Sequence, residues 1–241
     1  MPVLLMTVWL TGCVQEEFES TPSPAGNGIR FTLTVPDVNL PSVSSRTMTG
    51  TGTAKKEDEI ETVDILVFDA SKTPAVYLEW VTATGVTQDL ADNSTVSFSA
   101  KLPFTTASTC IVVVANKELD DIVSGFKKGV TTKVQAMEKM LHTQTGKWLA
   151  DGSTTGGYTR IPMYGEKVIS KITPSMDPIT GINMKRMLAR IDIHNNSITS
   201  NFTVEEVYLA NYNTTGYIAP AWNTNGQVTE PTPDTPVLPS G

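Results

Sequence analysis

Histidine, cysteine and clustered carboxylates, on which most catalytic and metal sites depend, are scarce in this sequence. Its 241 residues include two histidines, His142 and His194, which lie too far apart in the chain to share a metal at a familiar spacing. No Gly-x-Ser-x-Gly motif occurs, and the glycine-rich stretch DGSTTGG lacks the Lys-Ser/Thr of a phosphate-binding loop. The sequence therefore predicts a protein that is not an enzyme and that has no cofactor and no metal site.

Basic charge and aromatic rings are also in short supply. The net charge of −7 and the pI near 4.9 argue against binding to nucleic acid, whose phosphates need a basic surface. Aromatic residues make up 7% of the chain, and Trp80, Trp148 and Trp222 fall in separate segments. A platform of rings for binding sugars is therefore not evident.

Long hydrophobic runs are missing too, and the one near the start is short. Val3 to Leu10 is mostly apolar, but a membrane-spanning helix needs roughly 20 such residues. The run ends in Leu10-Thr11-Gly12-Cys13, which resembles the lipobox of bacterial lipoproteins, although no Lys or Arg precedes it. We expect residues 1–12 to be an export signal and the Cys13 sulfur to carry lipid. Cys110, in the apolar run TCIVVVAN, is then left without a disulfide partner and is expected to pack inertly in a buried strand.

The chain does contain a series of short segments bounded by turn residues, and in most of them apolar and polar residues alternate. A Ser- and Pro-rich tether precedes IRFTLTV, and it is followed by ETVDILVFDA, AVYLEWVTA, TVSFSAKLPF, CIVVVAN, RIPMYGE, EKVISKITPS and MLARIDIHN. This pattern predicts a mainly β protein, specifically a β-sandwich. One helical patch interrupts it, with Val134, Met137 and Leu141 at helical spacing and Asn116 or Thr131 as a cap. The charged run at residues 55–59 is interpreted as the solvated start of a strand.

The first alternating segment is followed by a basic residue in a flexible setting. Ile29, Phe31, Leu33 and Val35 fall on one face of a strand, and Arg46 lies beyond it in SVSSRTMTGTG. A cut after Arg46 would separate this strand from the rest of the chain. The alternative is that residues 29–35 form a permanent edge strand and that Arg46 is an ordinary loop residue.

Several of these stretches, in this order, resemble the fimbrillins of Bacteroidales type V pili. They are the lipobox at Cys13, SSRTMTG before EIETVDILVFDA, STCIVVVAN before the helical patch, RIPMYGE and MKRMLARIDIHN. The resemblance implies a transthyretin-like β-sandwich N-terminal domain with a short helical insertion, followed by an incomplete second β domain. The implied division is a signal peptide at 1–12, a lipidated tether and removable strand at 13–46, the sandwich at 47–198, and the start of a second β domain at 199–241.

The resemblance also implies a function and partners. A trypsin-like, Arg-specific surface protease would cut between Arg46 and Thr47 and release the strand carrying Ile29, Phe31, Leu33 and Val35. A strand from another pilus subunit would then fill the groove, giving a fimbria used in adhesion. Until the cut, acyl chains on Cys13 would hold the protein at the outer membrane. Two alternatives stay open, namely an uncleaved fimbrial anchor subunit and a surface glycan-binding lipoprotein, and stalk, tip and anchor roles are not distinguished.

Overall fold

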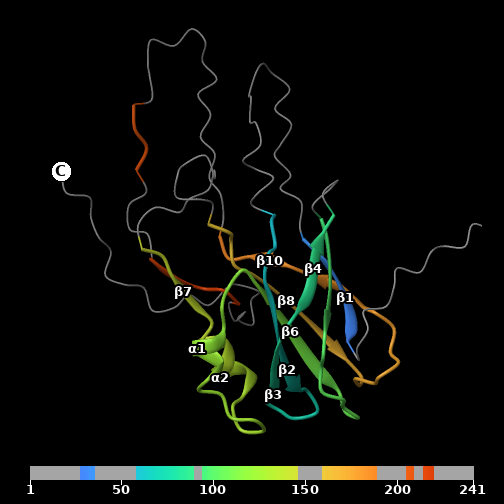
Figure 1. The fold of residues 1–241 in the computed structure, drawn as a ribbon. Coiled ribbons are helices and arrows are strands. Elements are labelled where there is room, and N and C mark those ends of the chain that lie inside the picture. The colour runs from blue at the N-terminus through green and yellow to red at the C-terminus, as the bar shows by residue number, and fades with distance from the viewer. Residues whose placement is uncertain are drawn as a thin grey trace, which may run out of the picture.

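The computed structural model describes residues 28–35, 58–89, 94–145, 159–188, 205–208 and 214–219, and within them the chain forms two facing β-sheets (Figure 1). Sheet A has the order β4 (Thr84–Gln88), β5 (Thr95–Ala100), β1 (Ile29–Thr34), β9 (Ile179–Asn183). Sheet B has the order β10 (Lys185–Arg186), β8 (Met163–Ile169), β6 (Thr109–Ala115), β2 (Val63–Asp69), β3 (Val76–Thr82). A short pair joins β7 (Leu141–Thr143) to β11 (Thr215–Tyr217). The predicted mainly β fold is confirmed.

The main core lies between the two sheets. Alternate residues of each strand point into it, as expected for strands whose side chains change face at every residue. From sheet B these include Ile65 of β2 and Val113 of β6, and from sheet A they include Phe31 of β1 and Phe98 of β5. All of β6 is buried, because its other face is covered as well. The prediction of a fully buried strand around Cys110, made from its continuous apolar run, is therefore confirmed.

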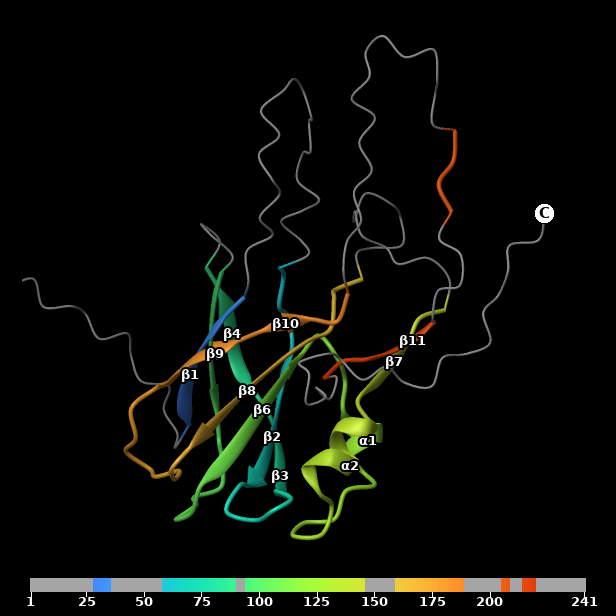
Figure 2. The ribbon, with the colours of Figure 1, turned by 180° about the vertical axis from the view of Figure 1, so that it is seen from behind.

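The outer face of sheet B carries a second apolar cluster beneath two short helices, α1 (Asp120–Val123) and α2 (Lys133–Glu138) (Figure 2). A helix of this kind needs only one apolar face toward the sheet. From the helical side the buried residues include Val123 of α1, Ala136 of α2 and Met140 just beyond α2. Ile218 and Ala219, which follow β11, belong to the same cluster.

The predicted helical patch is present as α1 and α2, with Met137 packed against the cluster, but other predicted details of the patch were wrong. Val134 is 57% exposed, and Leu141 lies in β7 because α2 ends at Glu138. The residue that caps α2 is Thr132, whose hydroxyl accepts from the Gln135 amide while the Gln135 side chain accepts from the Thr132 amide. One helix was expected to continue to Leu141, but the chain turns into a strand there.

The two sheets meet where β9 leads into β10. Met184 joins these strands, so one stretch of chain passes from sheet A to sheet B. Gly165 of β8 faces this crossing, and a Cβ there would lie 2.8 Å from the backbone oxygen of Asn183. That distance is far below van der Waals contact, so the absence of a side chain at 165 lets β9 pass close to β8. The segments RIPMYGE and EKVISKITPS, predicted separately, share the single strand β8.

No helix within these described ranges is long and apolar enough to cross a membrane.

Candidate functional site

Strand β1 occupies the middle of sheet A. It pairs antiparallel with β5 through six residue pairs, from Ile29 opposite Ala100 to Thr34 opposite Thr95. On its other side it pairs in parallel with β9 (Figure 2). The interpretation of residues 29–35 as a permanent edge strand is therefore wrong. The alternation showed which face is buried but carried no information on the number of neighbouring strands.

The inward face of β1 is closed off from solvent along its whole length. Ile29, Phe31, Leu33 and Val35 are 6%, 1%, 0% and 1% exposed. Residues Arg30 and Thr32 are half-buried and Thr34 is exposed, as predicted from the alternation. Four apolar side chains of one short segment thus complete the main core.

The wall formed by β5 presents residues of different sizes to this face. Ala100 lies opposite Ile29 and Val96 lies opposite Leu33. Between them, the rings of Phe31 and Phe98 stack with centroids 4.9 Å apart and planes 8° from parallel. The wall therefore provides a flat aromatic surface at one position only.

The wall formed by β9 contains a bulge. Phe31 is level with Ile179 and Leu33 with Ile182, so β9 uses one more residue than β1 over this interval. Gly181 lies within the extra length at a φ of +70°, which glycine adopts without strain. Both isoleucines are consequently buried, at 3% and 0% exposure.

The C-terminal end of β1 is fixed by two main-chain hydrogen bonds beyond the regular ladders. The Val35 amide donates to the Ser94 carbonyl over 2.7 Å, and the Met184 amide donates to the Thr34 carbonyl over 2.8 Å. The second bond joins β1 to the crossing between the two sheets. Any strand occupying this position would meet the same pair of main-chain partners.

A second notable segment, residues 58–61, leads into β2 and is held by charged side chains. Arg186 of β10 forms an ion pair with Asp58, and the two side chains are 15% and 10% exposed. Arg160 pairs with Glu59 at 3.3 Å and with Glu61 at 2.9 Å. The interpretation of this region as a solvated start of a strand was wrong for Asp58, which is buried. No local pattern indicated this burial, because the cationic partner of Asp58 lies far along the chain.

Two amide side chains reinforce the same segment. Gln88 at the end of β4 accepts from the Ile60 amide and donates to the Asp58 carbonyl. Asn116 donates to the Glu59 carbonyl over 2.8 Å and accepts from the Glu61 amide over 3.0 Å. Its φ of 58° is a left-handed conformation that asparagine tolerates better than most residues. Asn116 therefore holds the segment that leads into β2. Its predicted role as a helix cap was wrong.

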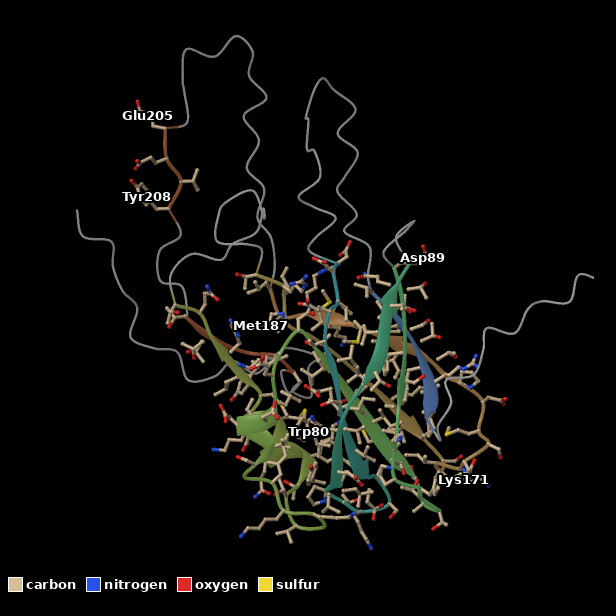
Figure 3. All side chains as sticks on the ribbon, viewed as in Figure 1. Trp80, Asp89, Lys171, Met187, Glu205 and Tyr208 are labelled. Atoms are coloured by element: carbon tan, nitrogen blue, oxygen red, sulfur yellow. The ribbon has the colours of Figure 1, made fainter. Side chains whose placement is uncertain are left out.

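A further polar group inside the described ranges, the Asp64 carboxyl, is buried and hydrogen-bonded. Asp64 of β2 accepts from the Trp80 indole over 3.0 Å and from the Thr82 hydroxyl over 2.8 Å. Burial raises the pKa of the Asp64 carboxyl, although these two hydrogen bonds lower it in part. Trp80 is half-buried beside the helices (Figure 3), where it packs against the second apolar cluster. Sequence analysis missed Asp64, because a lone acid in an apolar strand gave no indication of its donors.

Cys110 and its surroundings fit the predicted inert role. Its side chain is 3% exposed, and burial raises the pKa of the thiol. The neighbouring Lys133 is paired with Glu166 at 2.7 Å, along a groove of about 570 Å³ between α2 and β8. Raising a thiol pKa lowers the thiolate fraction and hence its reactivity.

Several predicted positions lie outside the described residues. They are Cys13, Arg46, Thr47, Trp148, His194 and Trp222. His142 lies in β7. Among the residues that the structure describes, no group of three or more His, Cys, Asp and Glu side chains is arranged to hold a metal ion. The geometry therefore directs attention to β1 and the two strands that flank it.

Comparison with known proteins gives a family match and distant structural likenesses. A family model for the major fimbrial subunit protein (FimA) matches residues 29–205. Among curated proteins, no sequence matches this chain.

The solved structures similar to this chain include three bacterial proteins. A fimbrial assembly protein of Parabacteroides distasonis is 13% identical with a TM-score of 0.46, covering 85% of this chain and 73% of that one. A candidate cell adhesion protein of the same species is 18% identical with a TM-score of 0.43, covering 90% and 65%. A candidate adhesin of Bacteroides ovatus is 13% identical with a TM-score of 0.37, covering 87% and 61%. These three are too distant to carry an argument, whereas the family match spans most of the chain.

Proposed function

The chain belongs to the family of major fimbrial subunit proteins (FimA), and from that premise we propose that it is a pilus subunit in which β1 is a removable strand. Membership of this family implies a place at the cell surface and contact with other pilus subunits. In the proposed cycle, lipid on Cys13 anchors the precursor to the outer membrane. An Arg-specific protease then cuts between Arg46 and Thr47, and a strand from another subunit replaces β1.

The observation that carries the proposal is the central position of β1 in sheet A. Removing a central strand exposes main-chain edges on both β5 and β9, together with the core face between them. Exposed edges of this kind are templates for pairing with another chain. Addition of a strand restores both the hydrogen-bond ladders and the apolar contacts.

The amount of apolar surface on β1 makes replacement a condition for stability. Its four buried side chains contribute about 1.5–3 kcal/mol each, or roughly 6–12 kcal/mol together as an upper estimate. Whole domains are stable by only about 5–15 kcal/mol. A domain that loses β1 is therefore marginal until another strand enters.

The contacts of residues 58–61 fit a cut on their N-terminal side. Cleavage after Arg46 leaves Asp58, Glu59 and Glu61 on the retained part of the chain, together with their arginine partners. Because these ion pairs hold the start of β2 to β10 and to Arg160, the retained part keeps its first strand in place. Sheet B is thus anchored independently of β1.

Limited proteolysis of the purified full chain tests the proposal. An Arg-specific protease should produce a new N-terminus at Thr47, and the cut protein, but not the intact one, should form oligomers with a subunit that supplies a strand. Arg46→Ala should remain a folded monomer. Arg46→Lys is the matched control, because it keeps the charge and should be cut by trypsin but not by the Arg-specific enzyme.

Two results would count against this mechanism. The first is a new N-terminus elsewhere than Thr47, and the second is unimpaired oligomer formation by Arg46→Ala. If Arg46 is not cut in cells while Cys13 carries lipid, the uncleaved anchor subunit becomes the better description. Mass spectrometry of the precursor and of Cys13→Ala reads out the lipid separately, because only the first should carry acyl chains.

A further inference from the structure

We propose that Phe98 selects the incoming strand, so that the groove vacated by β1 accepts a segment with an aromatic residue at the second of four alternating apolar positions. This inference rests on the proposed function, since it concerns which partner fills the groove. The partner is an extended segment of another polypeptide with the pattern apolar-x-aromatic-x-apolar-x-apolar.

The four inward positions of β1 are not equivalent. Ile29 lies opposite Ala100 and Leu33 opposite Val96, where the wall offers only aliphatic contacts. Phe31 alone meets a ring, at 4.9 Å between centroids and 8° between planes. Stacked rings contribute beyond the area they bury, whereas an aliphatic side chain on a ring obtains only the area term.

The opposite wall supports the same position. Ile179 of β9 is level with Phe31, and it is 3% exposed. The bulge at Gly181 allows Ile179 and Ile182 to face the core together, so the wall is aliphatic at the ring position and at the Leu33 position beyond it. A ring at the second position therefore fits between Phe98 and an aliphatic wall.

The printed sequence shows where such a segment does and does not occur. The pattern with an aromatic residue at the second position is found at Ile29–Val35 and at Val96–Leu102. The second of these includes β5, which pairs with β4 and itself forms a wall of the vacated groove, so it cannot also fill that groove. The occupant is therefore assigned to a different polypeptide rather than to another part of these 241 residues.

Competition between peptides on the cut full-length protein tests the inference. The protein is cleaved by the Arg-specific protease, loaded with a fluorescent peptide of residues 28–35, and challenged with unlabelled peptides. The challengers are the same sequence, its Phe31→Leu variant and its Phe31→Trp variant. The acceptors are the wild-type protein, Phe98→Leu and Phe98→Tyr, each first checked for folding by circular dichroism.

On the wild-type acceptor, the Phe31→Leu peptide should bind about three- to tenfold more weakly than the unchanged and Phe31→Trp peptides. On Phe98→Leu this preference should disappear, and on Phe98→Tyr it should return because the ring is restored. Equal binding of all three peptides to the wild-type acceptor would overturn the inference and leave strand replacement intact. Failure of every peptide to enter the cut protein would instead overturn the proposed function, and the inference with it. The measurements on the wild-type acceptor can refute the inference by themselves, so the inference stays testable even if a Phe98 variant does not fold.

Discussion

The segments on either side of residues 36–57 are held to the domain in opposite ways. β1, before this interval, is held by apolar side chains and main-chain ladders to β5 and β9. Residues 58–61, after it, are held largely by ion pairs to Arg160 and Arg186 and by the amides of Gln88 and Asn116. Apolar insertion is chemically generic, because any strand with the right pattern reproduces it. Ion pairs and amide contacts at fixed positions are specific to this chain, which suits a segment that stays.

The largest expected loss of stability comes from truncating an apolar side chain of β1. Phe31→Ala should lower the free energy of unfolding by about 3–5 kcal/mol, because it removes a fully buried ring and leaves a cavity beside Phe98. Urea denaturation measures the loss, which should be the same at low and high salt.

Thr34→Ala is the matched control on the exposed face of the same strand, where a change of about 0.5 kcal/mol or less is expected. Similar losses for the two variants would mean that the inward face of β1 is not what holds it.

Asp58→Asn removes the ion pair that holds residues 58–61 to β10. It should lower the free energy of unfolding by about 3 kcal/mol, at the lower end of the range for breaking a buried ion pair. The substitution keeps the shape but leaves the Arg186 cation without its carboxylate. Urea denaturation measures the loss, and because both side chains of the pair are largely buried, the loss should change little with salt.

Glu61→Gln provides the comparison, because the Glu61 side chain is 60% exposed and such a pair contributes only about 0–1 kcal/mol. A loss for Asp58→Asn no larger than this would show that residues 58–61 are not held through charge.

The smallest effect concerns Asp64 in β2, just after residues 58–61. It is a change in the pH dependence of stability. Burial raises the folded-state pKa of Asp64 above its ordinary 3.8, so the folded protein binds more protons than the unfolded chain between these two values. Stability attributable to Asp64 is therefore lost as pH rises through the folded pKa. Relative to wild type, Asp64→Asn should gain stability as pH rises from below 3.8 to neutrality, as measured by thermal denaturation across this range.

Thr82→Val sharpens this measurement, since it removes a hydrogen bond that lowers the Asp64 pKa. The pH-dependent difference should then grow. A difference that runs in the opposite direction would mean that hydrogen bonding outweighs burial at this carboxylate.

The strands were largely predictable from the sequence, whereas their neighbours were not. Alternation at Ile29–Val35 indicated the buried face, and the continuous apolar run around Cys110 indicated a strand covered on both faces. That β1 lies between β5 and β9 depends on pairing between residues far apart in the chain. Main-chain hydrogen bonds are alike for all residues, so this pairing leaves no local pattern.

The helical patch and the charged segment illustrate two other limits. Spacing favoured one apolar face through Val134 and Leu141, but α2 ends at Glu138, and the chain then joins β11 through β7. Asp58 looked solvated because its neighbours are charged, yet its partner Arg186 lies more than a hundred residues later. Local propensity is a weak guide wherever tertiary contacts decide the outcome.

The sequence by itself determined that this protein is mainly β, which residues of β1 face inward, and that β6 is buried. Those features follow from side-chain period and hydrophobicity, which are properties of each segment alone. Only the tertiary structure decided that β1 is central, that Phe31 stacks on Phe98, and that residues 58–61 are held by distant arginines. These features depend on which segments meet when the chain closes its core, and that choice is made by the free energy of the whole fold rather than by any one segment.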